Sequence, residues 1–205
     1  MDGKGQESGP RGILVLYFFI GFAISVIVGW IIFPKLLYSQ KKQPIDFNHV
    51  LHVEAVDEGC ESCHFFREDG SFSGIPKLAQ CIDCHESAQG ENPEEIKFVE
   101  AYVANEAEVP WLSYSRQPDC VFFSHAAHIK MAELECTVCH GNIGESENSR
   151  LYEENIITGY SRDIWGKNIA GIKKNTWDRM KMDDCAECHA DMGGGRKDAC
   201  FVCHK

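Results

Sequence analysis

The hydrophobic residues of this chain are most concentrated near its amino terminus. An uncharged run extends from Ile13 to Phe33, and as a helix it would be roughly 30 Å long, which is enough to cross a bilayer. A signal peptide is the alternative, but its apolar region usually has only about 7 to 15 residues and ends at a small-x-small site. This run ends in Trp30, Phe33 and Pro34, so we expect a retained anchor.

Polar and charged residues are interspersed through the rest of the chain, beginning with a tether over residues 34–46. One helix is predicted after Asn92, a capping residue that Pro93 follows in the first turn. An apolar stripe at helical spacing continues it, and we expect the stripe to pack in the core: Ile96, Val99, Tyr102 and Val103. The expected fold is mainly α-helical and irregular, with little or no sheet.

One pentapeptide, Cys-x-x-Cys-His, occurs five times in this polar part. The spacing is typical of c-type haem attachment, in which two thiols add to the porphyrin vinyl groups and the adjacent histidine ligates the iron. The thioethers would form at Cys60, Cys63, Cys81, Cys84, Cys136, Cys139, Cys185, Cys188, Cys200 and Cys203. The proximal iron ligands would be His64, His85, His140, His189 and His204.

Zinc binding is the alternative to haem at these motifs. Zinc would need pairs of such Cys-x-x-Cys elements, whereas the number here is odd and a histidine follows every second cysteine directly. Five macrocycles would also replace much of the side-chain core that the sequence lacks. We therefore expect five haems, and a chain without them should be largely unfolded.

A longer pattern, Phe-x-His-x-x-His, precedes two of the motifs. Phe47, His49 and His52 lead to the first motif, and Phe123, His125 and His128 lead to the third with identical spacing. We interpret the repeat as an internal duplication within a haem domain over residues 47–205, with modules starting near residues 47 and 123. Two histidines three residues apart share a helical face and could reach two irons, although surface or core histidines are the alternative.

The histidines are too few to give every iron two imidazoles. Five haems would need ten, and the chain has nine. The sixth ligand of one iron is therefore a methionine, a lysine amine, a group from a partner or absent, and a methionine ligand would raise the potential of that haem. The methionine candidates are Met131, Met180, Met182 and Met192, the last of which adjoins a glycine-rich loop.

Cys120 is the eleventh cysteine and has no partner for a disulfide, because the other ten belong to the motifs. It lies shortly before His125 and outside any Cys-x-x-Cys-His motif. Two interpretations stay open: a sixth haem held by a single thioether, or a buried unmodified thiol.

Charge and topology restrict the partners. The formal net charge is -11, from 31 acidic and 20 basic residues, which disfavours nucleic acid and favours a small basic electron carrier. Covalent haem is attached outside the bacterial cytoplasmic membrane, so residues 1–12 should be cytoplasmic and the haem domain periplasmic. Small residues at Gly21, Ser25 and Gly29 share one face of the anchor, where a neighbouring membrane helix could pack, although glycine is common in such helices.

The paired histidines before a haem motif resemble those of the class III multihaem cytochromes. That resemblance implies that His49, His52, His125 and His128 are distal iron ligands. The anchor, the histidine pairs and the five motifs together also resemble the multihaem subunit of the quinone reductase complex of sulfate-reducing bacteria and the related pentahaem subunit of alternative complex III. Because the first of these is described as hexahaem, the resemblance favours a haem at Cys120.

The resemblance implies an electron-transfer subunit of a respiratory complex in the inner membrane. It would take electrons from a basic soluble cytochrome c and pass them through partner subunits toward menaquinone, with no catalytic site of its own. One alternative is a stand-alone membrane-anchored quinol dehydrogenase, which has the same layout. Another is a multihaem reductase of a small molecule, but the sequence shows no acid and base groups to support it.

Overall fold

The computed structural model describes residues 10–114, 116–117, 119–157, 159, 182–193 and 200–204. Met180 and most of the glycine-rich loop before Cys200 lie outside these residues. The chain divides into two compact units. The first contains residues 1–39 and 155–159, and the second contains residues 40–154 and 160–205.

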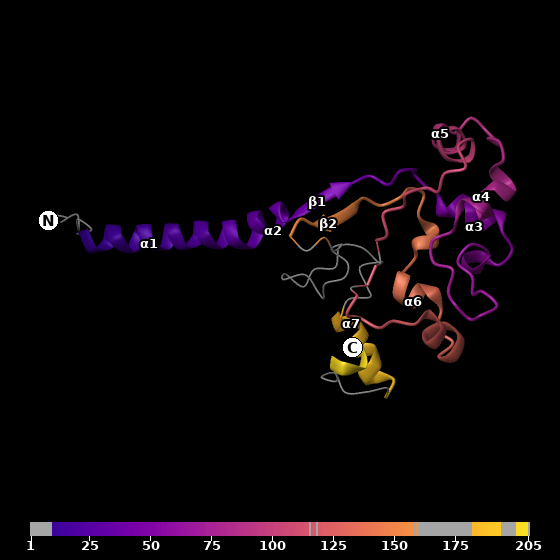
Figure 1. Cartoon of the computed structure of the whole chain (residues 1–205). Coiled ribbons are helices and arrows are strands. Elements are labelled where there is room, and N and C mark those ends of the chain that lie inside the picture. The colour runs from indigo at the N-terminus through magenta and orange to yellow at the C-terminus, as the bar shows by residue number, and fades with distance from the viewer. Residues whose placement is uncertain are drawn as a thin grey trace, which may run out of the picture. The chain divides into compact units, whose positions relative to one another are not determined.

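The first unit consists mainly of the apolar helix (Figure 1). Helix α1 (Pro10–Ile27) continues through a π-helical turn, η1 (Val28–Ile32), into α2 (Phe33–Leu36). The segment Arg11–Ile32 is long and apolar enough to cross a membrane, with a mean hydropathy of 2.5. The predicted apolar helix is confirmed, and it extends past Phe33 into α2, which has Pro34 in its first turn, a position where proline is tolerated.

The small-residue face of the apolar helix, which runs from α1 into η1, is open in this unit. The Ser25 hydroxyl donates to the carbonyl oxygen of Gly21 at 2.8 Å, so its polar group is satisfied within the helix. A Cβ atom added at Gly21 or Gly29 would meet nothing within 4 Å. The face is therefore smooth and sterically accessible to a neighbouring helix.

A two-stranded sheet pairs β1 (Tyr38–Lys41) with β2 (Tyr152–Asn155). Within the second unit, the Gln40 amide donates to Glu153 at 2.8 Å, and the Lys41 ammonium pairs with Glu154 at 2.7 Å. These contacts join residues 40 and 41 to residues 153 and 154 through polar groups, and they contribute little to a core.

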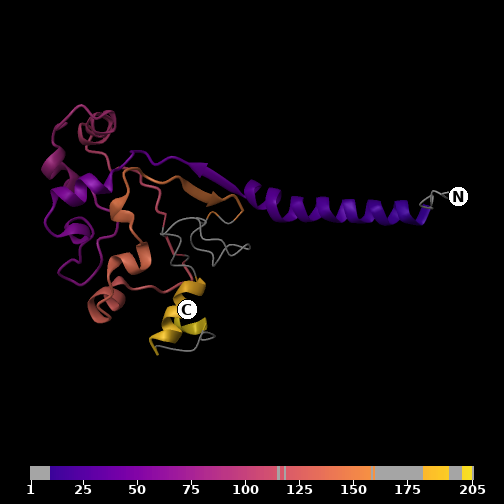
Figure 2. The same cartoon turned by 180° about the vertical axis from the view of Figure 1, so that it is seen from behind.

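The rest of the second unit is made of short helical segments joined by loops (Figures 1 and 2). They are α3 (His49–Ala55), η2 (Gly59–Ser62), α4 (Leu78–His85), α5 (Pro93–Phe98), η3 (Val99–Val103), η4 (Ala126–Met131), α6 (Cys136–His140), η5 (Ile143–Glu145), α7 (Met182–Asp191) and η7 (Cys200–Val202). The expectation of a mainly helical and irregular fold with little sheet is confirmed. Half of these segments carry parts of the pentapeptide motifs.

The hydrophobic core of the described residues is small. Four apolar side chains are buried, namely Ile45, Leu78, Phe98 and Val109. Partly buried residues of α4 and η3 pack against them, and Trp111 completes the cluster. A core of this size leaves most of the haem domain without an apolar interior of its own, which is the condition expected if cofactors fill it.

The helix after Asn92 forms as predicted, but its apolar stripe differs in one position. The Asn92 side chain accepts from the amide of Glu94 at 2.9 Å and caps α5. Val99, Tyr102 and Val103 pack against the core as expected, whereas Ile96 is 37% exposed and Phe98 is buried instead. The π-helical turn η3 explains this difference, because its wider hydrogen bonding rotates the following residues relative to α5.

Candidate functional site

All five motifs lie at helical turns. Segments α4, α6 and α7 contain whole motifs, and η2 and η7 contain the beginnings of the first and last. In the last two cases the turn still closes through the histidine: the His64 amide donates to the Cys60 carbonyl, and the His204 amide donates to the Cys200 carbonyl, each at 2.9 Å. A helical turn brings the two thiols and the imidazole of a motif to one side of the backbone, where one macrocycle can engage all three.

The ligand-type side chains do not converge as they would around zinc. In the part of the chain that the structure describes, no three His, Cys, Asp or Glu side chains are placed to hold a single metal ion. A structural zinc site needs four such donors at about 2.0 to 2.3 Å from one point. The described residues therefore contain no preformed cluster of this kind.

The first histidine pair is held by its own phenylalanine. Asn48 begins α3, and its side chain accepts from the Leu51 amide at 3.1 Å. The Phe47 ring stacks on His52 with 4.1 Å between ring centres and an interplanar angle of 25°, and it meets His49 edge-on at 4.8 Å. One aromatic ring thus fixes the orientation of both imidazoles.

The second pair repeats this geometry. Ser124 takes the place of Asn48, and its hydroxyl accepts from the Ala127 amide at 3.3 Å. The Phe123 ring stacks on His128 at 4.7 Å and 22°, and it meets His125 edge-on at 4.9 Å. The same spacing in sequence therefore produces the same local arrangement in the two modules.

In the second histidine of each pair, a backbone carbonyl determines which ring nitrogen carries the hydrogen. His52 Nδ1 lies 2.7 Å from the carbonyl oxygen of Asn48, and His128 Nδ1 lies 2.8 Å from that of Ser124. A carbonyl oxygen only accepts, so Nδ1 must carry the hydrogen. The lone pair is then on Nε2, which faces away from the backbone and is the nitrogen available to a metal.

In two further histidines the contacts of Nδ1 favour the same tautomer. His64 Nδ1 lies 2.8 Å from the carbonyl oxygen of Gly74. His49 Nδ1 lies 3.0 Å from the Ser146 hydroxyl, which donates its own hydrogen to Ile143 and so accepts from the ring. In each of these imidazoles the lone pair is on Nε2, where it can bind a metal, so the residues fit the ligation that a haem would require.

Burial keeps two of the imidazoles in the neutral form that ligates metal. It lowers the pKa of His49 to about 4, with smaller contributions from the positive charges of His64, His52 and Arg150. Burial likewise lowers the pKa of His140 to about 4, followed by the charge of His125. Both rings are therefore unprotonated at neutral pH and able to donate a lone pair.

Three pairs of imidazoles lie at similar distances from each other. The ring centres are 6.0 Å apart for His52 and His85, 6.4 Å for His125 and His140, and 6.0 Å for His128 and His189. Metal–nitrogen bonds of about 2 Å on both sides of one iron would place two ring centres roughly 6 Å apart. Each pair thus joins one histidine of a module with one motif histidine at the distance that a shared iron needs.

A carboxylate beside His85 was missed from the sequence. Glu95 Oε1 accepts from His85 Nδ1 at 2.8 Å and from the Gln89 amide at 2.9 Å. The hydrogen bond from the Gln89 amide is the main cause that lowers the pKa of Glu95, and the hydrogen bond from His85 lowers this pKa further. Glu95 lies in the first turn of α5, and the Asn-Pro-Glu-Glu helix start was the one sequence signal that could have indicated a functional carboxylate there.

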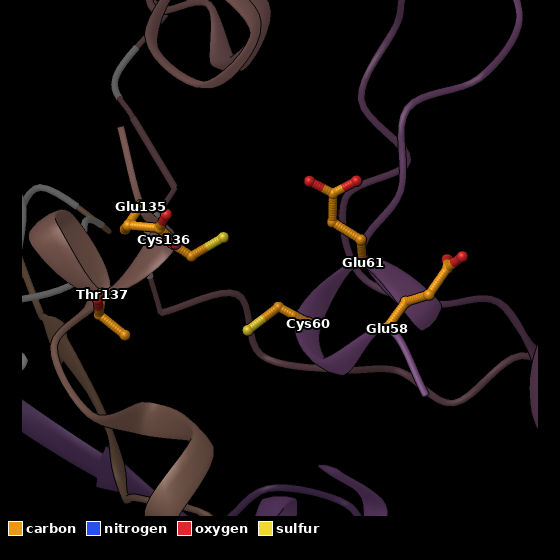
Figure 3. Close-up of a pocket in the computed structure, with 6 residues that line it drawn as sticks. All are labelled: Glu58, Cys60, Glu61, Glu135, Cys136 and Thr137. Carbon is orange, nitrogen blue, oxygen red and sulfur yellow. The ribbon is translucent and has the colours of Figure 1, made fainter. Parts of the chain in front are cut away.

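A cavity of about 400 Å³ separates the first and third motifs. Its lining residues are Glu58, Cys60, Glu61, Glu135, Cys136 and Thr137. Figure 3 shows the thiols of Cys60 and Cys136 pointing toward each other across this space from η2 and α6. The first cysteines of two motifs that lie far apart in the sequence are thus neighbours.

Other motif cysteines are close enough to influence one another. Burial raises the pKa of the Cys81 thiol, and Cys63 of the first motif raises it further. Burial raises the pKa of Cys185 to about 11, with additional contributions from Cys139 and Cys203. The motif cysteines are therefore near one another in the order second, first, third, fourth and fifth.

Cys120 is exposed, which differs from the burial that one of its two interpretations, an unmodified thiol, included. The next residues run antiparallel to the last motif: Val121 forms a bridge with His204, and the Phe122 amide donates to the Cys203 carbonyl at 2.7 Å. This edge pairing holds residue 120 at the surface, beside the fifth motif. A thiol in that position is accessible for covalent modification.

Of the methionine candidates, Met131, Met182 and Met192 are exposed, and Met180 lies outside the described residues. The Met192 sulfur lies 3.7 Å from the thiol of Cys188, one turn earlier at the end of α7. It is therefore placed at the attachment edge of the fourth motif.

Comparisons with known proteins place this geometry in a family. A model described as Class III cytochrome C family matches residues 33–113, and a model described as Cytochrome c7 and related cytochrome c matches residues 121–205. The multiheme cytochrome c subunit of menaquinone reductase from Nitratidesulfovibrio vulgaris (strain Hildenborough) is 42% identical over 201 residues, covering 92% of this chain and 89% of that protein. The chain belongs to this family of multihaem cytochromes c.

Membership in this family settles the class of cofactor. The cytochrome carries several c-type haems, in agreement with its repeated motifs and its eleven cysteines. The resemblance to the quinone reductase subunit that its motifs indicated is confirmed.

Proposed function

We propose that this cytochrome is the electron-transfer subunit of a membrane-bound menaquinone reductase complex. The observation that carries the proposal is the 42% identity, over nearly the whole chain, to a subunit of that name. The apolar helix Arg11–Ile32 supports membrane attachment, with residues 1–12 in the cytoplasm, an anchor over residues 13–33 and the haem domain in the periplasm. Partner subunits would complete the path to menaquinone.

The chain's own residues would hold five haems. Two cysteines of each motif form the thioethers and the motif histidine binds from the proximal side, while His49, His52, His125 and His128 bind from the distal side. The Nδ1 contacts support this assignment, because they orient the free Nε2 atoms. Bound haem would supply a one-electron iron couple at each site. The exposed Cys120 is the proposed attachment point of a sixth haem.

The contacts between motifs support a linear relay. The second motif adjoins the first, where the Gln80 side chain donates to the Cys63 carbonyl at 3.3 Å. The first and third share the cavity between Cys60 and Cys136. The fourth follows through Cys185, and the fifth ends the series at the C-terminus, which lies beside α7 in both views (Figures 1 and 2). Electrons would therefore enter or leave at the second and fifth motifs.

A basic soluble cytochrome c is the proposed electron donor. The net charge of -11 is carried beyond the anchor, since Asp2, Lys4, Glu7 and Arg11 balance one another in the first 33 residues. An acidic surface attracts a basic carrier and raises its rate of association, and salt screens that attraction. Reduction by such a donor should slow as the ionic strength rises.

Purification from membranes in a mild detergent tests the proposal. The cytochrome should co-purify with integral and periplasmic subunits, and the isolated complex should reduce a menaquinone analogue when a reduced basic cytochrome c is supplied. A protein that purifies alone and oxidises menaquinol directly would contradict the proposal in favour of the quinol dehydrogenase alternative.

A further inference from the structure

The structure allows the histidine ligands to be assigned iron by iron, because all nine histidines lie among the described residues. The three imidazole pairs use His52, His125 and His128 on one side. Of the histidines outside the motifs, these pairs leave only His49. Of the motif histidines, they leave His64 and His204.

His49 belongs with His64. It begins α3, which packs on η2, the segment that opens the first motif. The Nδ1 contacts of the two rings, to Ser146 and Gly74, leave both Nε2 atoms available. Every histidine outside the motifs is then assigned, and His204 alone has no second imidazole.

We propose that, of the five motif haems, the haem held by Cys200, Cys203 and His204 is the one whose iron has no histidine on its distal side, and that it binds small external ligands such as carbon monoxide or cyanide. This inference rests on the five haems of the proposed function. It goes further by identifying which iron lacks a second histidine when nine histidines serve five haems.

Among the described residues, several side chains at and beside this motif are exposed. Cys200 and Cys120 are exposed, and Phe201 is 88% exposed. Val121 and Phe122 contact this motif through their backbones, and neither residue has a side chain that could ligate the iron. Met192 is committed to the neighbourhood of Cys188 in the fourth motif. An open iron here would sit at one end of the proposed relay.

Carbon monoxide binding to the reduced full-length protein in detergent tests the inference. A Cys120→Ser background removes any haem at that position, and the intact mass counts the remaining haems independently of the ligand measurement. We expect one carbon monoxide bound per five haems. If the mass shows fewer than five haems, the proposed cofactor set fails; if five are present and none binds carbon monoxide, only the present inference fails.

Single-thioether variants locate the responsive haem. Cys200→Ser leaves one vinyl group unreacted, which extends the conjugation of that ring and moves its absorption to longer wavelength. We expect the carbon monoxide difference spectrum to move in Cys200→Ser and to stay unchanged in the matched Cys185→Ser variant of the fourth motif. A shift in Cys185→Ser alone would overturn the assignment, and so would the charge-transfer band of a methionine-ligated haem together with no carbon monoxide binding. If Cys200→Ser does not assemble, Cys203→Ser provides the same readout.

Discussion

The two histidine-pair modules share the contacts that orient their ligands and differ in what surrounds the next motif. In each module, the side chain of a capping residue accepts a hydrogen bond at the start of the turn. The backbone carbonyl of the same residue accepts from the second histidine, and a phenylalanine stacks on that histidine ring. The first module is continued by α5, which brings Glu95 to His85, whereas a much longer stretch, residues 141–184, separates the motifs of the second. The contacts around the paired histidines are therefore the same in both modules, whereas the surroundings of the following motif differ.

The fifth motif stands outside both modules. It has no Phe-x-His-x-x-His segment of its own, and its backbone pairs with residues 121 and 122, ahead of the second module. Under the proposed ligand scheme, the two modules supply the distal histidines of four haems. The fifth motif has no corresponding segment.

The largest expected effect comes from removing the haems, which should abolish the structure of both modules together. The described core has only four buried apolar side chains, so haem faces must provide most of the interior. The full chain produced without haem attachment should lack a cooperative thermal transition. Such a transition, followed by circular dichroism, would show that the polypeptide folds by itself and would contradict this view.

Removing the second histidine of either pair should open one further haem to carbon monoxide, to the same extent in both modules. His52→Ala frees the iron proximal to His85, and His128→Ala frees the iron proximal to His189, since each pair of rings is 6.0 Å apart. In the Cys120→Ser background, each variant should raise the number of haems that bind carbon monoxide from one to two. An increase in only one of the two variants would break the equivalence of the modules.

A smaller effect should distinguish the modules. Glu95→Gln replaces a charge-assisted hydrogen bond to His85 with a neutral one, a loss on the order of 1 kcal/mol, and the potential of that haem should rise by on the order of 40 mV. Redox titration followed by absorption spectroscopy measures the change.

Glu94→Gln is the matched control, because Glu94 accepts from the Asp46 amide at 2.9 Å and does not contact His85. Its potentials should match those of the unmodified protein. Equal shifts in the two variants would mean that general surface charge, and not the hydrogen bond to the imidazole, sets the potential.

The smallest expected effect concerns the caps. Asn48→Ala and Ser124→Ala each remove one side-chain acceptor at the start of a turn, and each should lower the free energy of unfolding by about 1 kcal/mol. Denaturant unfolding followed at the haem absorption band measures both. A cost in one variant and none in the other would show that the two turns are not energetically equivalent.

The sequence predicted the parts of the site that depend on local spacing. Motif intervals identified the attachment residues, and the repeated intervals placed His49 and His52 on the same face of α3. Pairing His52 with His85 required the tertiary fold, because nothing in the intervals says which iron a histidine reaches. Glu95 was missed for the same reason, and Ile96 was placed wrongly because a π-helical turn cannot be recognised from apolar periodicity.

Near-infrared magnetic circular dichroism of the oxidised full-length protein, with the haems counted by intact mass, tests the central claim most directly. It identifies the axial ligands of every ferric haem at once. In the Cys120→Ser background the two modules should give four bis-histidine haems, and the fifth motif should give one haem without a second histidine. Fewer than four bis-histidine haems among five would contradict the duplicated ligand scheme.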